Sequence, residues 1–334
     1  MQFQDERPKN HSPSAVRESA VSSRAALRVE QKEWIAEGVC WLRLADSRGA
    51  RLPDWAPGAH IDVGLADGQV RQYSLCGDRW DPMAYEIAVN LESDSRGGSV
   101  YIHRHLNVGD QVEVGGPRNN FMLAPAEHYL FVAGGIGITP LLPMIEQATM
   151  MGIPWRLLYG SRQRARMAFL DRLRTHSGRV TVASRDSGTR LDLAAAVHAA
   201  PSGTKVYCCG PASMLEEIER LCTDLPPGSL RRERFVAREQ IAPVRSQPYE
   251  LELARSGRTL TIGPGESILD AVHAAGVPLL ASCRQGLCGT CETAVLCGVP
   301  DHRDSILSDP ERQRNDLFFP CVSRSSSDRL VIDL

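Results

Sequence analysis

The sequence lacks any long apolar run and any strong excess of charge of one sign. Its hydrophobic stretches are far shorter than the roughly 18 residues that a membrane-spanning helix needs. Lysine and arginine together number 38 against 40 aspartates and glutamates, which gives a net charge of −2. Such a balance supplies no bulk field that would favour nucleic acid or an anionic membrane. We therefore expect neither of these as a partner.

The N-terminal segment also lacks the apolar core of a secretory signal peptide. Residues 1–25 are polar and carry scattered charges, and we expect a mobile extension there, with a short docking helix as the alternative. The protein is then expected to stay in the cytoplasm, where its ten cysteines are not expected to form disulfides. Clustered cysteines in that compartment point to metal or redox chemistry.

The length of 334 residues favours two or three domains over a single core. Residues 26–124 contain short alternating runs, such as Tyr85, Ile87 and Val89, between glycine and proline turns. This pattern predicts a small antiparallel β-barrel. Residues 125–236 alternate apolar strands with helical patterns, which predicts an α/β domain with a parallel sheet.

The remaining residues predict a linker and a third domain. Residues 237–248 contain two prolines and no periodicity, as expected of a linker. Residues 249–334 begin with alternating strands, continue with a short helix that Ser267 is expected to cap, and close with a strand at Leu330–Ile332. We therefore expect a multidomain chain with a barrel, an α/β domain and a small α+β domain. A monomer is compatible with this organisation.

Four cysteines of the third segment have the spacing of a plant-type [2Fe–2S] ferredoxin. Cys283, Cys288 and Cys291 share one loop with the pattern Cys-x4-Cys-x2-Cys, and Cys321 comes from a distant segment. A structural zinc site usually takes two short-spaced pairs, whereas only Cys288 and Cys291 form such a pair here. The cluster is therefore the favoured interpretation, with zinc or unliganded cysteines as the alternatives.

Other residues near this loop support the same interpretation. Gly286 and Gly289 permit a positive φ and let the loop N–H groups approach the inorganic sulfides closely. We expect these N–H groups, together with Arg284, to moderate the charge that reduction adds. Cys297 is a nearby spare thiol, which we expect to pack in the protein interior rather than to replace a ligand.

A glycine-rich turn follows the strand expected at Tyr129–Ala133. A helix N-terminus there would offer N–H groups and a partial positive charge to a pyrophosphate, although a turn of this kind also occurs for packing alone. We expect Thr139 to cap this helix and Pro140 to take its first position. The turn comprises Gly134, Gly135, Gly137, Ile138, Thr139 and Pro140.

Two further strand ends of the α/β segment carry candidate nucleotide ligands. The second strand ends at Ser161 and Arg162, with Arg164 and Arg166 close behind. An arginine without a nearby acid favours the 2′-phosphate of NADPH, and a solvated face is the alternative. The last strand ends at Cys209, Gly210 and Pro211. Cys209 is either a neighbour of the nicotinamide or a plain buried thiol.

The barrel segment carries residues suited to a flavin phosphate and ring. On one expected strand, Arg71 offers a fork for a phosphate, Tyr73 a flat surface and Ser74 a small hydrogen-bonding group. Gln72 lies between them. A later loop, Arg96-Gly97-Gly98-Ser99, offers amides and a hydroxyl to the same phosphate. Each fragment is a weak signal alone.

In this order, the motifs resemble those of the phthalate dioxygenase reductase family, which includes vanillate demethylase reductases. The resemblance spans about residues 27–334 and implies an FMN-binding barrel, an NAD-binding domain and a β-grasp ferredoxin domain. The motifs are Arg71–Leu75, Arg96–Ser99, Gly134–Pro140, Cys209–Pro211, Glu233-Arg234-Phe235 and the four cluster cysteines.

The resemblance also implies roles for individual residues. Ala88, Val89 and Asn90 would border the flavin ring, beside the strand from Arg71 to Ser74. Gly97, Gly98 and Ser99 would hold the FMN phosphate. Family members mostly use NADH, which makes NADH the expected donor despite Arg162. The residues expected to position the hydride, with none acting as nucleophile or general base, are Ser74, Thr139, Cys209 and Phe235.

The activity so implied is electron transfer from NADH through FMN to the cluster and on to an acceptor. Plant-type clusters have potentials near about −400 mV, and the His-ligated cluster of a Rieske-type oxygenase lies higher. We therefore expect a terminal oxygenase, acting on an aromatic or related small substrate, as the partner. The alternatives are an NADPH-preferring reductase, one that serves a cytochrome P450, and a non-catalytic redox sensor built from the same domains.

Overall fold

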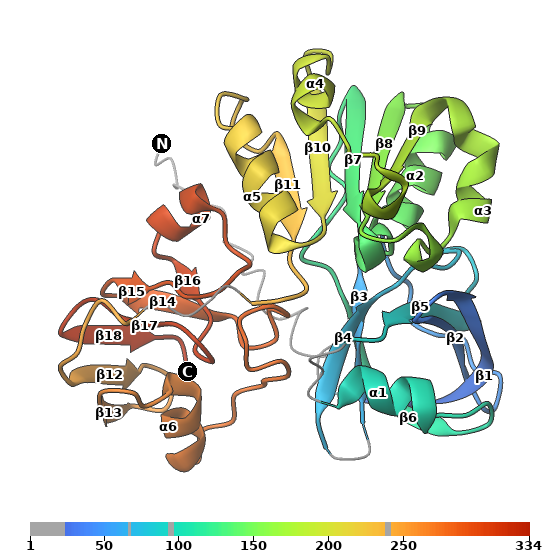
Figure 1. The fold of residues 1–334 in the computed structure, drawn as a ribbon. Coiled ribbons are helices and arrows are strands. Elements are labelled where there is room, and N and C mark those ends of the chain that lie inside the picture. The colour runs from blue at the N-terminus through green and yellow to red at the C-terminus, as the bar shows by residue number, and fades with distance from the viewer. Residues whose placement is uncertain (1–23, 66–67, 93–96, 238–241) are drawn as a thin grey trace, which may run out of the picture.

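The computed structural model describes residues 24–65, 68–92, 97–237 and 242–334. Three main sheets form three lobes that follow one another along the chain (Figure 1). The first sheet is antiparallel, the second parallel and the third mixed, which confirms the predicted fold class. Among the described residues, no helix has both the length and the apolar character needed to cross a membrane.

The first sheet has six strands in the order β4-β3-β6-β1-β2-β5. A bridge between Leu75 and Ile87 links the end of β4 to β5, so the two edges of the sheet meet as in a barrel. Ile61, Val63 and Ile87 are buried in its core. The elements of this lobe are β1 (Ala25–Ala36), β2 (Val39–Asp46), β3 (His60–Gly64), β4 (Val70–Ser74), β5 (Ala84–Asn90), α1 (Gly98–Arg104) and β6 (Gln111–Arg118).

The second sheet has five parallel strands in the order β11-β10-β7-β8-β9. Four were expected from the sequence, whereas β11 was not, because Leu230–Glu233 is one leucine followed by three charged residues and shows no strand periodicity. The strands are β7 (His128–Gly134), β8 (Trp155–Ser161), β9 (Val180–Ser184), β10 (Thr204–Cys209) and β11. The helices are α2 (Leu141–Met150), α3 (Leu170–Leu173), α4 (Leu193–His198) and α5 (Ala212–Leu221), with 3-10 turns η2 (Gly135–Ile138), η3 (Arg164–Arg166), η4 (Arg174–Arg179) and η5 (Arg185–Ser187).

The first two lobes share a hydrophobic core. Val39, Cys76 and Ala88 of the first lobe pack in one cluster with Phe131 and Tyr159 of the second. Both faces of β5 are therefore buried, since Ile87 belongs to the barrel core and Ala88 to the shared cluster. This shared core fixes the end of the second sheet against the barrel.

The third lobe has a mixed sheet in the order β13-β12-β18-β14-β16. The hydroxyl of Ser267 accepts a hydrogen bond from the N–H of Asp270, which confirms Ser267 as the cap of α6. The elements are β12 (Tyr249–Leu253), β13 (Arg258–Ile262), α6 (Ile268–Ala274), β14 (Thr293–Cys297), β15 (Pro300–Asp301), α7 (Asp309–Gln313), β16 (Leu317–Phe318), β17 (Arg324–Ser325) and β18 (Arg329–Ile332).

Candidate functional site

The glycine-rich turn after β7 does not have the predicted cap. Thr139 has helical φ and ψ, and its hydroxyl donates to the carbonyl of Ile136 at 2.9 Å. The turn η2 runs almost directly into α2, which begins at Leu141 after Pro140 without a side-chain cap. The prediction that Thr139 caps this helix is therefore wrong, because the preceding glycines already form a helical turn.

The structure brings this turn against the end of β10. A Cβ placed on Gly137 would lie 2.2 Å from the carbonyl oxygen of Cys209, and one on Gly134 would lie 2.4 Å from the Pro211 ring. The same added Cβ on Gly134 would lie 3.1 Å from the Cα of Gly210. Close approach of two backbones, rather than a positive φ, explains these glycines. The two predicted nucleotide motifs thus meet at the carboxyl edge of the sheet, where open α/β sheets bind ligands.

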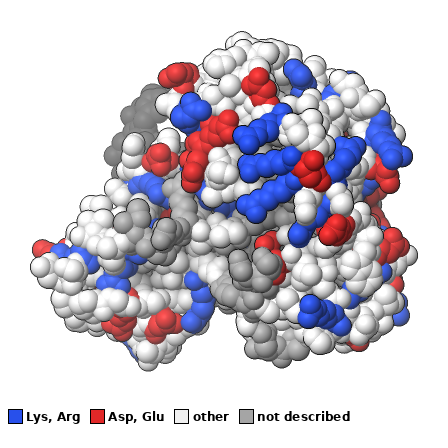
Figure 2. Space-filling view, in the orientation of Figure 1, with Lys and Arg blue, Asp and Glu red and all other residues white. Residues whose placement is uncertain are grey.

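The arginines after β8 have different surroundings. Arg162 and Arg164 are exposed, but Arg166 turns to the first lobe and donates to Asn90 Oδ1 at 3.1 Å and to the Leu91 carbonyl at 3.3 Å. Arg166 and Asn90 therefore form a contact between the lobes. On the face in Figure 2, basic side chains gather over the second lobe with acidic ones among them.

Sequence reasoning missed an acidic residue near this strand end. Asp186, in the turn after β9, accepts the N–H of Arg164 at 3.0 Å and donates its own N–H to the Arg162 carbonyl at 3.1 Å. Hydrogen bonds, first from Ser184, lower the pKa of its carboxyl. An acid thus lies beside the end of β8 after all. It follows the neighbouring strand β9, so the residues that follow β8 in the sequence do not reveal it.

Some of the predicted flavin residues meet where β4 contacts the glycine loop, and others are buried or hydrogen-bonded within the protein. Arg71 on β4 packs on Gly98, where an added Cβ would lie 2.9 Å from its Nε, so the strand and the glycine loop do meet. Val89 is buried in the barrel core, and the Asn90 amide bonds to Glu92. The hydroxyl of Ser99 accepts the N–H of Glu92 at 3.2 Å. Gly97 caps α1, Ala88 is in the shared core, and Arg96 lies outside the described residues.

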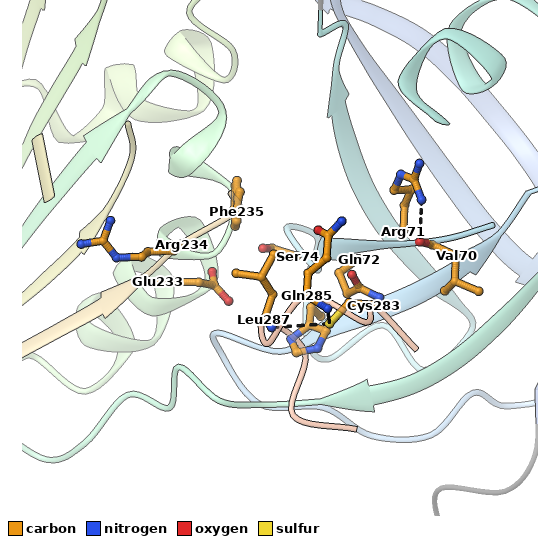
Figure 3. A pocket seen from close by; sticks show the side chains of 11 residues that line it. Val70, Arg71, Gln72, Ser74, Glu233, Arg234, Phe235, Cys283, Gln285 and Leu287 are labelled. Atoms are coloured by element: carbon orange, nitrogen blue, oxygen red, sulfur yellow. Dashed lines mark hydrogen bonds between the residues drawn. The ribbon is translucent and has the colours of Figure 1, made fainter. Parts of the chain in front are cut away.

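One cavity lies where all three lobes meet (Figure 3). Its empty volume is about 600 Å³, a figure that includes the open mouth. Arg71, Gln72 and Ser74 of β4 line one side, and Phe235 lines another. The remaining wall residues are His60, Val70, Glu233, Arg234, Cys283, Gln285 and Leu287.

Three buried polar atoms of residues that line this cavity have no hydrogen-bond partner among the described residues, namely His60 Nε2, Glu233 Oε2 and Arg234 Nε. Burial raises the pKa of Glu233 to about 8, and the nearby Ser74 side chain offsets only part of this rise. Burial, together with Arg118, lowers the pKa of His60 to about 4. Unpaired buried groups are costly. The cavity therefore fits a ligand with polar atoms, such as a flavin ring.

The four predicted cluster cysteines come together in the third lobe. The sulfur of Cys283 accepts the N–H groups of Gln285 at 3.3 Å and Leu287 at 3.4 Å. The thiol of Cys288 is hydrogen-bonded to that of Cys283, which with burial raises its pKa. Contact with Cys283 lowers the pKa of Cys321, but contact with Cys291 and burial outweigh it and raise the pKa to about 12. Iron binding would replace the protons of these closely packed thiols and bind them as thiolates.

These contacts fit a two-iron cluster better than a single ion. Cys283 contacts Cys288 and Cys321, and Cys321 also contacts Cys291. Within the described ranges, no three His, Cys, Asp or Glu side chains are arranged as one metal ion requires. Loop N–H groups pointing at sulfur are what a reduced [2Fe–2S] centre needs.

The glycines of the cluster loop have the predicted left-handed backbone. Gly286 has a φ of 66° and Gly289 a φ of 72°. A Cβ on Gly286 would lie 2.9 Å from the Cα of Asp304, so the loop passes tightly over another segment. The side chain of Arg284 pairs with Asp270 at 3.1 Å.

The prediction for Cys297 is wrong, because this thiol is exposed on β14 and does not pack in the interior. It follows an irregularity in the pairing of β14 with β18, between Val295 and Cys297. Val295, two residues earlier, still packs on the core, but the strand ends at Cys297 and leaves its thiol exposed.

Comparison with known proteins agrees with this geometry. Residues 251–326 match the family of 2Fe-2S iron-sulfur cluster binding domains, and residues 131–220 match the oxidoreductase NAD-binding domain. The phenoxybenzoate dioxygenase subunit beta of Ectopseudomonas oleovorans is 44% identical over 318 residues, which cover 95% of this chain and 99% of that protein. Phthalate dioxygenase reductase of Burkholderia cepacia is 36% identical over 92% of this chain and 97% of that protein. The chain belongs to the phthalate dioxygenase reductase family.

Solved structures carry the same relationship through all three lobes. The structure of phthalate dioxygenase reductase has a TM-score of 0.68 at 35% identity and covers 93% of this chain and 98% of that one. An intact type IV self-sufficient cytochrome P450 monooxygenase has a TM-score of 0.88 at 37% identity over 99% of this chain. This chain spans 43% of that longer protein.

The family fixes the activity. The protein is an NAD(P)H-dependent oxidoreductase that passes electrons through a flavin and a [2Fe–2S] cluster, as the reductase component of an oxygenase system. The predicted family, fold and enzyme class are thereby confirmed.

Proposed function

We propose that this reductase takes hydride from NADH, holds FMN, and delivers electrons to a Rieske-type terminal oxygenase that acts on an aromatic or related small substrate. The observation that carries the proposal is the cavity that Ser74, Glu233 and Phe235 line together with the expected cluster ligand Cys283. Donor, flavin and cluster ligand need such a common meeting point, because electron relay depends on fixed geometry.

The flavin would lie along β4 with its phosphate beside Arg71 and Gly98, whose close contact supports the assignment. When bound, the flavin accepts a hydride and releases electrons one at a time. Ser74 would position its ring, Phe235 would exclude water, and the neutral Glu233 would offer a proton as a hydrogen-bond donor. The full proposed set is Arg71, Gln72, Tyr73, Ser74, Ala88, Val89, Asn90, Gly97, Gly98, Ser99 and Thr139.

The nicotinamide dinucleotide would bind at the carboxyl edge of the second sheet. The close packing of the turn after β7 on the end of β10 supports a pyrophosphate site there. Asp186 supports NADH, since an acid can bind the ribose diol and repels a 2′-phosphate. The full proposed set is Gly134, Gly135, Gly137, Ile138, Thr139, Pro140, Ser161, Arg162, Cys209, Gly210, Pro211 and Phe235.

The test begins with the purified holoprotein. Its extracted flavin should have the mass of FMN, and it should contain about two irons and two acid-labile sulfides per chain. NADH should bleach the flavin with a higher kcat/KM than NADPH. Asp186→Asn should lower the ratio of the kcat/KM for NADH to the kcat/KM for NADPH. An FAD mass, or faster reduction by NADPH, would reject the corresponding part of the proposal.

The acceptor is tested separately. A reduced sample should transfer electrons to a purified Rieske-type oxygenase, whose cluster lies at a higher potential. A cytochrome P450 is a second candidate acceptor, favoured by the TM-score of 0.88 with the self-sufficient P450. Mixing the reduced protein with each acceptor under the same conditions separates the two, since only the true partner class should be reduced rapidly.

The proposed domain limits are 26–124 for the FMN barrel, 125–236 for the NAD domain, 237–248 for a linker and 249–334 for the ferredoxin domain, preceded by an extension over 1–25. The three sheets support these limits. Ten cysteines without disulfides among the described residues support a reducing compartment such as the cytoplasm. Apart from cuts in the extension over 1–25, limited proteolysis should cut first between 237 and 248, and an earlier cut inside 26–124 would contradict the proposed limits.

A further inference from the structure

The side chain of Gln72 joins the barrel to the cluster loop. Its Nε2 donates to Asp62 Oδ1 at 2.8 Å and to the hydroxyl of Ser282 at 3.0 Å. Ser282 comes directly before the cluster ligand Cys283. An amide from β4 therefore holds the residue next to a cluster ligand, although 210 residues separate the two in sequence.

The amide is fixed in place by a buried ion pair. Asp62 is only 5% exposed and pairs with Arg118 at 2.5 Å. The same carboxylate oxygen accepts the Gln72 amide. A donor whose direction is already set loses less side-chain entropy when it bonds to another domain. The barrel thus orients the Gln72 amide to donate to the hydroxyl of Ser282.

A second contact lies on the other side of the loop. Gly289 follows the ligand Cys288, and a Cβ placed on it would lie 2.8 Å from Asn120 Nδ2 and 3.3 Å from Asn120 Oδ1. The Asn120 side chain, just beyond β6, therefore lies close to the loop backbone at Gly289. The two barrel contacts flank the part of the loop that carries Cys283 and Cys288.

The flanked part of the loop is the part that faces the cavity. Cys283, Gln285 and Leu287 line it, together with Gln72 and the rest of its β4 wall (Figure 3). The N–H groups of Gln285 and Leu287 point at the sulfur of Cys283. Whatever holds the two ends of this segment also sets how closely the sulfur of Cys283 approaches a ligand in the cavity.

We propose that the Gln72–Ser282 hydrogen bond and the Asn120–Gly289 contact form a clasp that docks the cluster loop on the flavin cavity. Gln72, Ser282 and Asn120 are then positioning residues for electron transfer from flavin to cluster. The inference rests on the proposed flavin site. Each transfer takes one electron from the reduced flavin to one ferric iron, and one hydride from the nicotinamide supplies the electrons for two transfers.

The test uses Ser282→Ala and Asn120→Ala in the full-length holoprotein, alone and combined. After anaerobic mixing with NADH, flavin bleaching reports hydride entry, and the freeze-quenched signal of the reduced cluster reports the next step. Bleaching should stay within about twofold of the wild-type rate. Cluster reduction should slow by about two- to tenfold for Ser282→Ala, the ratio that loss of one net hydrogen bond gives, and further in the double variant.

Three controls keep the outcome decisive. Ser282→Thr keeps a hydroxyl and should reduce the cluster at close to the wild-type rate. Ser256→Ala, in a distant turn of the same lobe, should change neither the bleaching rate nor the rate of cluster reduction. Hydrogen exchange of residues 282–290 should rise with the slower rate if the loop undocks. If Ser282→Ala assembles less cluster, the rate of cluster reduction in Asn120→Ala becomes the deciding measurement, because that variant leaves the loop sequence intact.

The clasp is overturned if the double variant reduces its cluster at the wild-type rate, whatever the hydrogen exchange shows. Failure of the proposed function looks different. In that case NADH leaves the flavin unbleached in the wild-type protein as well, before the clasp is tested.

Discussion

Ser74, at the end of β4, and Glu233, at the end of β11, line the same cavity, and the Ser74 side chain offsets part of the rise that burial gives to the pKa of Glu233. This pairing links the first sheet to the second inside the cavity that Cys283 also lines. It brings a small polar group on a flavin strand to a buried acid on the nucleotide sheet.

Glu233→Gln should stabilise the protein increasingly as the pH rises. Burial raises the pKa of Glu233 to about 8 from 4.5. Between these values the native state keeps a proton that the unfolded state has lost, so the stability due to the neutral carboxyl declines up to about pH 8. Each pKa unit corresponds to at most about 1.4 kcal/mol.

Thermal melting at pH 5 to 9 checks this prediction. The gap in Tm between Glu233→Gln and wild type should widen up to about pH 8 and then stay constant. The exposed Glu216→Gln on α5 serves as the control and should keep a constant gap. Parallel melting curves for Glu233→Gln at every pH would show that Glu233 is not buried as described.

Gly137→Ala should disrupt the nucleotide site. The new methyl would lie 2.2 Å from the carbonyl oxygen of Cys209, so the two strand ends must separate, at a cost of about 1–3 kcal/mol. We expect a higher KM for NADH and a lower urea midpoint. Gly178→Ala, where no atom lies within 4 Å of the added carbon, should change both within error. An unchanged KM in Gly137→Ala would contradict the close packing.

Arg166→Ala should weaken the contact between the first two lobes without altering nicotinamide preference. The guanidinium bonds to Asn90 and Leu91, and losing these half-exposed bonds should cost about 1 kcal/mol. Chemical denaturation measures the loss, and the NADH to NADPH ratio of kcat/KM measures the preference. Arg164→Ala is the stability control. A changed ratio in Arg166→Ala would place this arginine at the cofactor instead.

Cys288→Ala should remove the cluster and leave hydride entry intact. The remaining three thiols leave one iron without a full set of ligands, so iron, labile sulfide and the cluster absorbance should be lost. NADH should still bleach the flavin. Cys297→Ala should keep the full iron content, because that thiol lies apart on β14. Full iron content in Cys288→Ala would reject the ligand assignment.

Much of the fold and part of the site could be predicted from the sequence. Period-two runs predict the barrel because one face of each strand is covered, and the spacing of Cys283, Cys288 and Cys291 reflects the size of the cluster itself. Local signals also explain the Ser267 cap. In each case the physical cause lies within a few residues of the pattern.

The features that were missed depend on distant segments. Asp186 reaches the end of β8 from the next strand, and Glu233 is buried because β4 and the cluster loop cover it. Thr139 lost its expected capping role because the glycines before it already form a helical turn. The polar strand β11 has no periodicity that would separate it from a loop. Pairings of this kind are decided by packing in three dimensions.

The core that Ala88 and Phe131 share across the first two lobes has a thermodynamic consequence. Because one hydrophobic cluster serves both sheets, neither lobe can lose its packing without exposing apolar surface of the other, so the pair should unfold cooperatively as a single unit. The third lobe keeps a separate core around Leu251 and Phe318. Calorimetry should accordingly resolve two heat-absorption peaks in a molecule with three sheets.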